Sequence, residues 1–204
     1  MSERVIVIGA SGHGKVVADI VVRRGDTLLG FLDDNKALPP EISGIPILGK
    51  LADYAKYKDA SFVVGIGSSA IREKIVRQLA DVRWYTAIHP SAVISTLDTY
   101  IGAGSVIMAN AVINPSAHVG EHSIINTSAV VEHDNYVGDF SHISVGVRLG
   151  GTVSVGSFTW VGIGATVSNN VSICDHCMIG AGAVIIRDIK ESGTYVGVPA
   201  RKIK

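Results

Sequence analysis

An aliphatic residue recurs at every sixth position over the second half of the chain. The series runs without interruption through Ile101, Ile107, Ile113, Val119, Ile125, Val131, Val137, Ile143, Leu149, Val155, Val161, Val167, Ile173, Ile179 and Ile185. A period of six matches neither the 3.6-residue period of an α-helix nor the two-residue alternation of an isolated strand. It is typical of a solenoid in which short strands stack and one aliphatic side chain per strand points inward. We therefore predict a parallel β-helix for the larger part of the chain.

Two earlier hexads, residues 88–93 and 94–99, precede this series, and Tyr100 shifts the phase by one residue. If three hexads form one triangular coil, residues 101–184 give fourteen hexads, and the whole repeat makes slightly more than five coils. The fifth position of most hexads is small, which predicts a continuous core along the axis. Glycine follows the aliphatic residue in several hexads, where we expect turns with positive φ: Gly102, Gly120, Gly138, Gly150, Gly156, Gly162 and Gly180.

The first part of the chain, residues 1–85, has a different pattern. An apolar run at 5–8 leads into a glycine-rich segment at 9–14 and an amphipathic stretch at 15–24. Further strands are predicted at 28–32 and 62–67 and a helix at 70–79, with a proline-marked loop between them. Strand, glycine-rich turn, helix and strand form a βαβ unit and a small parallel sheet. We predict an α/β, Rossmann-like domain at 1–85 and an all-β domain of hexapeptide repeats at 86–204.

Composition narrows the classes of partner. Lys+Arg and Asp+Glu both number 18, so the formal net charge is zero, which is unlike the basic patch of a nucleic-acid or membrane-surface protein. Hydrophobic residues make up 47% of the chain, yet no apolar run reaches the ~18 residues of a membrane-spanning helix. The short apolar run at the start leads directly into a turn, unlike a signal peptide. We expect a soluble, cytoplasmic protein that binds neither nucleic acid nor membrane.

The two cysteines, Cys174 and Cys177, have the C-x-x-C spacing of a redox pair or half of a zinc site. Both fall inside the hexapeptide repeat. Cys177 takes a fifth position, where the chain elsewhere places small inward side chains, and Cys174 should point away from the core. We interpret the pair as structural free thiols in a reducing compartment.

The glycine-rich segment 9–14 follows a strand and begins a helix, and the unpaired amides of such a helix start suit an anion such as a phosphate. Asp33, about twenty residues beyond it, can accept a hydrogen bond from a ribose hydroxyl. Gly67, after the third strand, should lie beside this turn because ligands collect at the carboxyl ends of parallel strands. The spacing G-x-x-G-x-G and the small domain favour one nucleotide over NAD; a ligand-free turn is the alternative. His13 either lines this site or caps local backbone.

The strongest chemical candidate is Glu132-His133-Asp134. His133 stands two residues past an inward aliphatic residue, which places it at a corner or on the outer surface. A neutral imidazole can act as a base, and a neighbouring carboxylate can orient it and stabilise its protonated form. A solvated polar turn is the alternative. His142 follows nine residues later, half a coil away, so the two imidazoles are expected to meet only across a subunit boundary or along a shared groove.

Four further histidines, His89, His118, His122 and His176, occupy different hexad positions. No three of them share a spacing that predicts a metal site, so we predict no metal ion. We interpret all four as surface residues.

Several segments together resemble a known family. They are Gly9-Ala-Ser-Gly-His-Gly14, Phe31-Leu-Asp-Asp34, Asn126-Thr-Ser-Ala-Val-Val-Glu-His-Asp134, Phe140-Ser-His-Ile-Ser-Val-Gly146 and Gly197-Val-Pro-Ala-Arg201. In both parts of the chain and in order, these segments resemble the bacterial sugar acetyltransferases that include sialic acid O-acetyltransferase and the N-acetyltransferases of nucleotide-linked 4-amino-4,6-dideoxy sugars.

This resemblance implies a left-handed β-helix, a homotrimer, and acetyl-CoA as cosubstrate in the groove between neighbouring β-helices. It implies that His133 is the general base that deprotonates the sugar amine and that Asp134 makes it more basic, although the family often has Glu there. It further implies two sets of binding residues. Acetyl-CoA would contact His142, Gly151, Ile163, Gly180 and Ala181, and the nucleotide-sugar would contact Ser11, Gly12, His13, Asp33, Asp34 and Gly67.

Three alternatives remain at this point. The same base would serve a sialic acid O-acetyltransferase, although the glycine-rich domain with Asp33 and Asp34 favours a nucleotide-linked sugar and N-acetylation. A non-catalytic scaffold, or a zinc enzyme similar to γ-carbonic anhydrases, is disfavoured by the His-Asp pair and by the histidine spacing. A nucleotide-dependent oxidoreductase is disfavoured by the short N-terminal domain and its glycine pattern.

Overall fold

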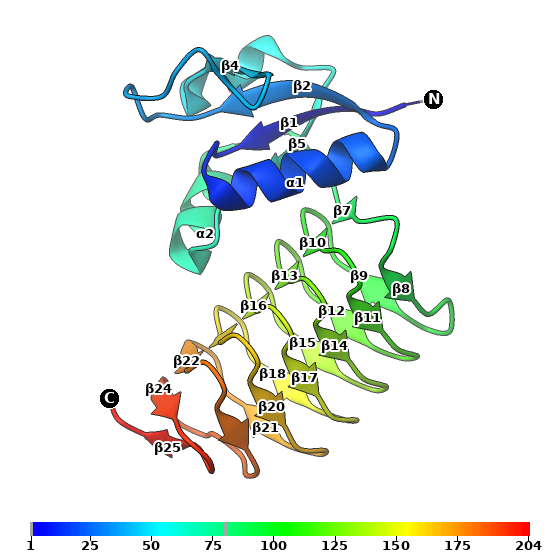
Figure 1. Cartoon of the computed structure of the whole chain (residues 1–204), viewed down its shortest axis with the longest axis vertical. Coiled ribbons are helices and arrows are strands. Elements are labelled where there is room, and N and C mark those ends of the chain that lie inside the picture. The colour runs from blue at the N-terminus through cyan, green and yellow to red at the C-terminus, as the bar shows by residue number, and fades with distance from the viewer. Residues whose placement is uncertain (1, 80) are drawn as a thin grey trace.

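The computed structural model describes residues 2–79 and 81–204 and consists of an α/β region followed by a left-handed parallel β-helix (Figure 1). The α/β region begins with a βαβ unit formed by β1 (Arg4–Ile8), α1 (Gly12–Arg23) and β2 (Thr27–Leu32). Its remaining elements are β3 (Glu41–Ile42), β4 (Ile45–Gly49), the 3₁₀ helix η1 (Leu51–Lys56), β5 (Ser61–Val64), α2 (Ser69–Gln78) and β6 (Arg83–Trp84).

The sheet of the α/β region is larger than predicted. Its six strands have the order β3-β4-β2-β1-β5-β6, and all pair in parallel except β3 with β4. The proline-marked segment, predicted as a loop, therefore contains two strands: the two-residue edge strand β3 and the five-residue β4 beside it. Neither α1 nor α2 is long and apolar enough to cross a membrane, within the residues described.

The β-helix is built from strands of two to four residues that stack into three flat faces. Face I contains β7 (Ala87–Ile88), β10 (Val106–Ile107), β13 (Ile124–Ile125), β16 (His142–Ile143), β19 (Trp160–Val161), β22 (Cys177–Ile179), β24 (Gly193–Val196) and, antiparallel, β25 (Arg201–Lys202). Face II contains β8 (Val93–Ile94), β11 (Val112–Ile113), β14 (Val130–Val131), β17 (Arg148–Leu149), β20 (Thr166–Val167) and β23 (Val184–Ile185). Face III contains β9 (Tyr100–Ile101), β12 (His118–Val119), β15 (Tyr136–Val137), β18 (Ser154–Val155) and β21 (Ser172–Ile173).

The register confirms the sixfold pattern. Ile107 pairs with Ile125 and Ile125 with Ile143, so each coil is 18 residues long and three hexads close one triangle. Ile101 pairs with Val119 although Ile94 pairs with Ile113, so the extra residue before Tyr100 is absorbed between β8 and β9. The aliphatic residues of the series and the small fifth-position residues form one buried cluster along the axis. Their burial provides the apolar free energy that stabilises the stack.

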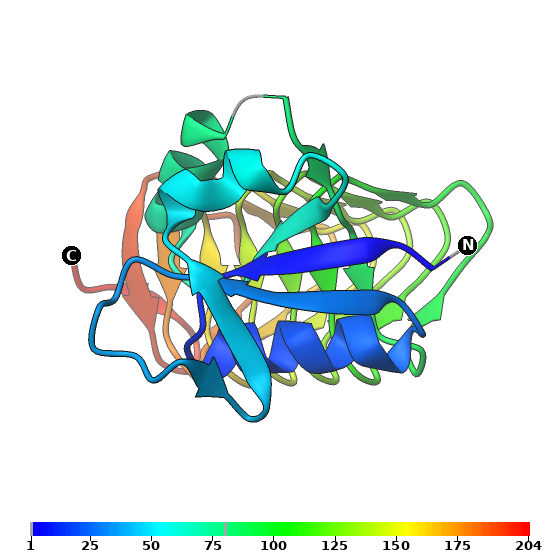
Figure 2. The ribbon, with the colours of Figure 1, turned by 90° about the horizontal axis from the view of Figure 1, so that it is seen from above.

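The α/β region covers part of face I, with α1 lying between its own sheet and the β-helix (Figures 1 and 2). Apolar side chains from the two parts form one buried cluster, in which Val17 and Val21 of α1 pack with Ala87, Val106 and Ile124 of face I. The two parts therefore share a core, and this junction fixes the position of the glycine-rich turn relative to the β-helix.

The glycines that follow the aliphatic residues have a different cause from the one predicted. Their φ values are not in the left-handed region; that conformation occurs two residues later, at positions such as Gly104, His122 and Phe140. A Cβ on Gly138 would lie 2.6 Å from the backbone nitrogen of Ser157 in the next coil. These positions need glycine because successive coils approach closely at the corners.

The prediction that all four remaining histidines lie on the surface is wrong for His122, which is 3% exposed. It lies at the corner between faces III and I, where it stacks on Phe140 (5.2 Å between ring centroids) and meets Trp84 edge-on (4.7 Å). Trp84 belongs to β6, so the junction with the α/β region buries this ring. His176 is exposed and ends the same stack through Phe158.

Cys174 and Cys177 are free thiols with their sulfur atoms 3.5 Å apart. Cys177 is buried in the axial core, as predicted for a fifth position. Cys174 was predicted to point away from the core, yet it packs partly against it, because the chain departs from the regular turn as β22 begins at Cys177. Burial raises the pKa of the Cys177 thiol to about 12, which keeps it protonated.

Candidate functional site

His133 lies in the turn between β14 and β15, at the corner between faces II and III. Its side chain is 57% exposed and that of Asp134 is 56% exposed, so the pair is on the outer surface, as the spacing predicts. The Nδ1 of His133 lies 2.7 Å from Oδ2 of Asp134. With its Nδ1 proton donated to Asp134, the imidazole presents the lone pair of Nε2, the arrangement required of a general base.

The backbone of this turn explains how an aspartate reaches the imidazole. Asp134 has φ +57°, a left-handed conformation that Asp and Asn adopt more readily than most residues. Its N–H donates to the carbonyl of Pro115 in the preceding coil (3.1 Å), and the His133 N–H donates to the Glu132 carboxylate (3.2 Å). The hydrogen bond to Asp134 raises the pKa of His133 above its ordinary value.

Gly151 lies one coil beyond His133, at the same corner, directly against the imidazole. A Cβ there would lie 2.6 Å from both Cε1 and Nε2 of His133. The Thr152 N–H donates to the His133 carbonyl (2.9 Å), and the Asn135 side-chain oxygen accepts from the Val153 N–H (2.6 Å). These hydrogen bonds join the two coils, and because Gly151 has no side chain, the imidazole of His133 has room to lie against it.

The His133–Asp134 contact predicts a pH effect. The raised pKa of His133 means that kcat/KM should increase with pH through a value above 6.5, since only the neutral ring accepts a proton. Asp134→Asn removes the charge that favours the imidazolium, so this limb should move to lower pH and kcat at neutral pH should fall about tenfold or more. Asp98→Asn is the control, because Asp98 is exposed with φ +52° in the equivalent turn of the first coil. If Asp134→Asn left the acidic limb of the kcat/KM profile at the wild-type pH, the role of Asp134 would be contradicted.

His142, on β16 of face I, is enclosed at the junction with the α/β region. It is 6% exposed, stacks on Trp160 (4.8 Å between centroids), and its Nε2 lies 3.0 Å from the amide nitrogen of Asn126. The ring of His13, at the start of α1, lies 6.3 Å away. Burial, and then the charge of Arg72, lower the pKa of His142 to about 3 and that of His13 to about 4, so both rings are neutral.

One nitrogen on each of these two rings is buried without a hydrogen-bond partner among the described residues. These atoms are Nδ1 of His142 and Nε2 of His13. Since buried polar atoms are normally satisfied, the two neutral rings offer a donor or acceptor to a bound molecule.

The structure places the predicted acetyl-CoA contacts on different edges of the prism. Gly151 shares the corner of faces II and III with His133, whereas Ile163, Gly180 and Ala181 lie at the corner of faces I and II. His142 lies on face I, opposite the His133 corner. One chain therefore does not bring His133 and His142 together, and Ile163 is 61% exposed at its edge.

The glycine-rich turn is shaped by close contacts. Gly9 has φ +98°, and a Cβ on Gly14 would collide with the carbonyl of Gly9. The helix α1 begins at Gly12, three residues earlier than predicted. Ser11 is its N-cap and makes no side-chain hydrogen bond there, so the first amides of α1 remain open to an anion.

A cavity of about 290 Å³ lies beside this turn at the carboxyl ends of β1 and β2, and its lining includes Asp33, Asp34 and Lys74. Both Asp33 oxygens accept backbone N–H groups, from Ala10 (2.8 Å) and Asn35 (2.8 Å). Asp34 accepts one, from Leu51 (2.9 Å). Asp33 thus holds the turn, while Asp34 retains more capacity for a ligand. Sequence reasoning missed Lys74, an exposed residue of α2 whose position is set only by the fold.

The glycine contacts predict a contrast between two substitutions in the turn. Gly14→Ala should destabilise the α/β region by about 1–3 kcal/mol through overpacking against Gly9, measured as a lower thermal midpoint. Gly12→Ala is the matched control: nothing lies within 4 Å of a Cβ at position 12, so its thermal midpoint should remain unchanged. Equal destabilisation by the two substitutions would contradict this account.

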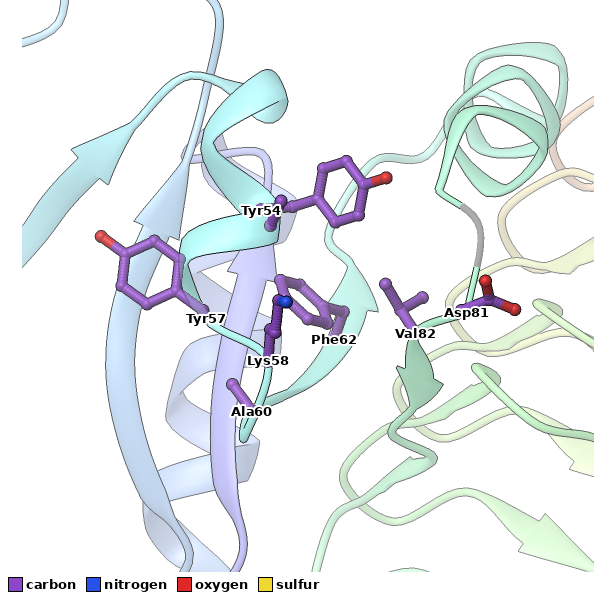
Figure 3. A pocket seen from close by; sticks show the side chains of 8 residues that line it. Tyr54, Tyr57, Lys58, Ala60, Phe62, Asp81 and Val82 are labelled. Atoms are coloured by element: carbon purple, nitrogen blue, oxygen red, sulfur yellow. The ribbon is translucent and has the colours of Figure 1, made fainter.

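A larger cavity, about 400 Å³, lies at the other end of the sheet, toward the amino end of β5 (Figure 3). It is lined by Tyr54 of η1, by Tyr57 and Lys58 just after η1, and by Phe62 and Val82. None of the predicted site residues lies there. Cavity volume alone therefore does not identify the functional site.

In the part of the chain that the structure describes, no group of three or more His, Cys, Asp or Glu side chains is placed to hold a metal ion.

Comparison with known proteins gives matches in both parts of the chain. Residues 4–79 match the PglD N-terminal domain, and residues 98–133 and 152–187 match the bacterial transferase hexapeptide (six repeats). The acetyltransferase domain of PglB from Neisseria gonorrhoeae FA1090, solved with acetyl coenzyme A, is 33% identical, with a TM-score of 0.94 and 100% of both chains covered. PerB from Caulobacter crescentus, solved with CoA and GDP-perosamine, is 35% identical over 98% of this chain and 97% of its own, with a TM-score of 0.92.

Among curated proteins, UDP-N-acetylbacillosamine N-acetyltransferase of Bacillus subtilis (strain 168) is 36% identical over 113 residues, which is 52% of this chain and 52% of that protein. A mimivirus protein of no stated activity matches over the same length, and the match covers 23% of it. The chain thus spans about half or less of the length of these curated relatives, whereas it covers 97–100% of the two solved structures above.

Proposed function

Because the chain belongs to the hexapeptide-repeat acetyltransferases that carry a PglD-type N-terminal domain, we propose that it transfers the acetyl group of acetyl-CoA to the amino group of a nucleotide-linked amino-dideoxy sugar. The observation that carries this proposal is the exposed His133–Asp134 pair, with Nδ1 held at 2.7 Å from the carboxylate, on a chain that is similar over its whole length to enzymes solved with CoA and GDP-perosamine. Residues 1–85 bind the nucleotide-sugar and residues 86–204 perform the transfer, in the cytoplasm.

In the proposed reaction, Nε2 of His133 accepts the proton of the sugar amine as its nitrogen attacks the thioester carbonyl. Asp134 stabilises the imidazolium that forms, and such a placed base contributes typically ~10²–10⁴ in rate. The tetrahedral intermediate collapses with cleavage of its C–S bond, the acetyl group stays on the sugar nitrogen, and the thiolate takes the proton from Nε2 of His133, so that CoA leaves as the thiol and the base is regenerated. The backbone N–H of Gly151, at the same corner, is the candidate donor to the developing oxyanion. The Caulobacter relative was also solved with single histidine substitutions together with CoA and GDP-perosamine, which supports a histidine at the centre of the chemistry.

A homotrimer is part of the proposal, because the contacts for acetyl-CoA are split between two corners of one chain. Packing three prisms around a common axis brings the His133 and Gly151 corner of one copy against Ile163, Gly180 and Ala181 of its neighbour. Acetyl-CoA then lies between copies and contacts His142 near its thioester. The exposed Ile163 supports this interpretation, since a protein-covered edge is where an apolar side chain is stable.

In this proposal the nucleotide-sugar binds at the carboxyl ends of the sheet strands. The open amides from Ser11 to His13 receive a phosphate, Asp34 accepts hydrogen bonds from the nucleoside, and Asp33 and Gly67 shape the surrounding turn. Gly12 supports this position, because the chain itself leaves space there that a close-approaching phosphate would use.

The decisive experiment measures thiol release from acetyl-CoA with a panel of UDP-, GDP- and dTDP-linked amino sugars, and with free sialic acid. We expect turnover with at least one nucleotide-linked amino sugar and an N-acetyl product by mass spectrometry. Turnover with sialic acid alone would replace the proposal with O-acetylation. No turnover with any acceptor would contradict the proposed activity.

A further inference from the structure

Arg72, on α2, is a buried cation at the junction between the α/β region and the β-helix. It is 1% exposed, and no carboxylate of the described residues lies within ion-pair distance of its guanidinium. Burial lowers its pKa to about 10, so it remains charged at neutral pH. Neither the sequence pattern nor the proposed reaction assigns this residue a role.

The guanidinium joins the two parts of the chain through backbone carbonyl groups. On the α/β side, Nη1 donates to Gly67 (2.7 Å) and Ile66 (3.2 Å). On the β-helix side, Nε donates to His122 (3.0 Å), and Nη2 donates to Phe140 (2.6 Å) and Ser141 (3.3 Å). All three nitrogens are used, and the planar fork fixes the angle as well as the distance between the two sides.

These carbonyls belong to the two segments that the proposed reaction must align. Gly67 lies in the turn at the carboxyl end of β5, beside the nucleotide-sugar site. Phe140 and Ser141 directly precede His142, whose ring faces His13 across the junction. The charge of Arg72 also contributes, after burial, to the lowered pKa values of His13 and His142, so it favours their neutral forms.

Simple cohesion between the two parts does not require a charge. Val17, Val21, Ala87, Val106 and Ile124 already pack together at this junction. A buried charge without a counterion is costly, and apolar replacements for buried ionic groups are often no less stable. The carbonyl contacts offset that cost and supply direction, which apolar packing does not.

We propose that Arg72 is a positioning residue for acetyl transfer, because its guanidinium fixes the Gly67 turn onto the segment before His142 and so sets where the bound nucleotide-sugar lies relative to the β-helix. This inference rests on the proposed function. It predicts that loss of the guanidinium weakens productive binding of the nucleotide-sugar more than binding of acetyl-CoA.

The test compares Arg72→Met and Arg72→Lys with the wild type at a temperature well below their thermal midpoints. The matched control is Arg77→Met, because Arg77 lies on the same helix, has a side chain that is 78% exposed, and pairs with Glu73 one turn away. We expect KM for the nucleotide-sugar to rise about tenfold or more in Arg72→Met, since a shift of about 1 Å in a bound substrate is costly. KM for acetyl-CoA should change less than about twofold, and Arg77→Met should resemble the wild type.

Arg72→Lys keeps the charge but lacks the fork, so it should retain the fold and show an intermediate rise in KM. In Arg72→Ala, millimolar guanidinium should lower KM for the sugar, whereas equal sodium chloride should not. A folded Arg72→Met or Arg72→Lys enzyme with wild-type KM values would overturn the inference while leaving the proposed function intact. The inference would also be overturned if the loss of activity in the variants only followed the fraction of unfolded protein. A wild-type protein without activity on any acceptor would instead contradict both.

Discussion

We expect His133→Ala to lower kcat by about 10²- to 10⁴-fold at saturating acetyl-CoA and nucleotide-sugar, with the β-helix intact. The imidazole is exposed at a corner and its backbone contacts do not involve the ring, so its removal leaves no cavity in the axial core. The acidic limb of the pH profile should disappear together with the rate, because the titrating group is gone. Steady-state kinetics and circular dichroism measure both parts of this result.

The control for this substitution is His176→Ala. His176 is an exposed histidine at a coil corner, and its ring stacks on Phe158 at the end of an aromatic stack. Its removal should change kcat less than about twofold, as expected for a surface residue away from the reaction. A His133→Ala enzyme that retains near-native kcat would refute the assignment of the base, whatever its KM values.

Gly151→Ala should reduce kcat about 100-fold without unfolding the protein, since a small displacement of a catalytic group has an effect of this size. The added Cβ would lie 2.6 Å from the imidazole of His133 and must displace it from the line to the sugar amine. The backbone at Gly151 is not in the left-handed region, so alanine introduces no strain there. The thermal midpoint should therefore change little while turnover falls.

A double-mutant cycle separates this mechanism from a direct effect on acetyl-CoA. In the His133→Ala background there is no imidazole to displace, so adding Gly151→Ala should cost little further activity. Independent, multiplying losses would show that position 151 acts through acetyl-CoA or through its own N–H, and would contradict the displacement account.

The hexapeptide spacing was enough to predict the β-helix, its coil length and the surface position of His133. One inward aliphatic residue per strand determines which positions face the axis and which face outward. The six-residue period therefore predicts the fold, the coil length and the outward position of His133 together. The predicted role of the glycines after each aliphatic residue was wrong, because the pattern shows where a small residue is needed but not whether conformation or close approach between coils requires it. The two strands in the proline-marked segment were missed because β3 has only two residues and β4 contains a proline, which argues against a strand.

The junction could not be predicted from the sequence. In the pattern Arg72 is one of several basic residues on an amphipathic helix, and its carbonyl partners in the β-helix are 50 to 69 residues away along the chain. His122 and His142 are buried at the junction, where they meet Trp84 and His13 of the α/β region. The resemblance indicated His13, Asp33 and Asp34. It did not show that Asp33 holds the turn while Asp34 has more capacity for a ligand, because this difference depends on backbone N–H groups that only the folded turn brings close.

The stacking of coils in steps of 18 residues limits how this architecture adjusts a site. Adding or deleting a coil moves a corner along the axis by one strand spacing, about 4.8 Å, and nothing smaller is available from the backbone. Fine adjustment of the reactive imidazole is left to the lengths of individual side chains. The aspartate beside His133 is such a side chain, so variation among related proteins should concentrate in the corner residues rather than in the number of coils between them.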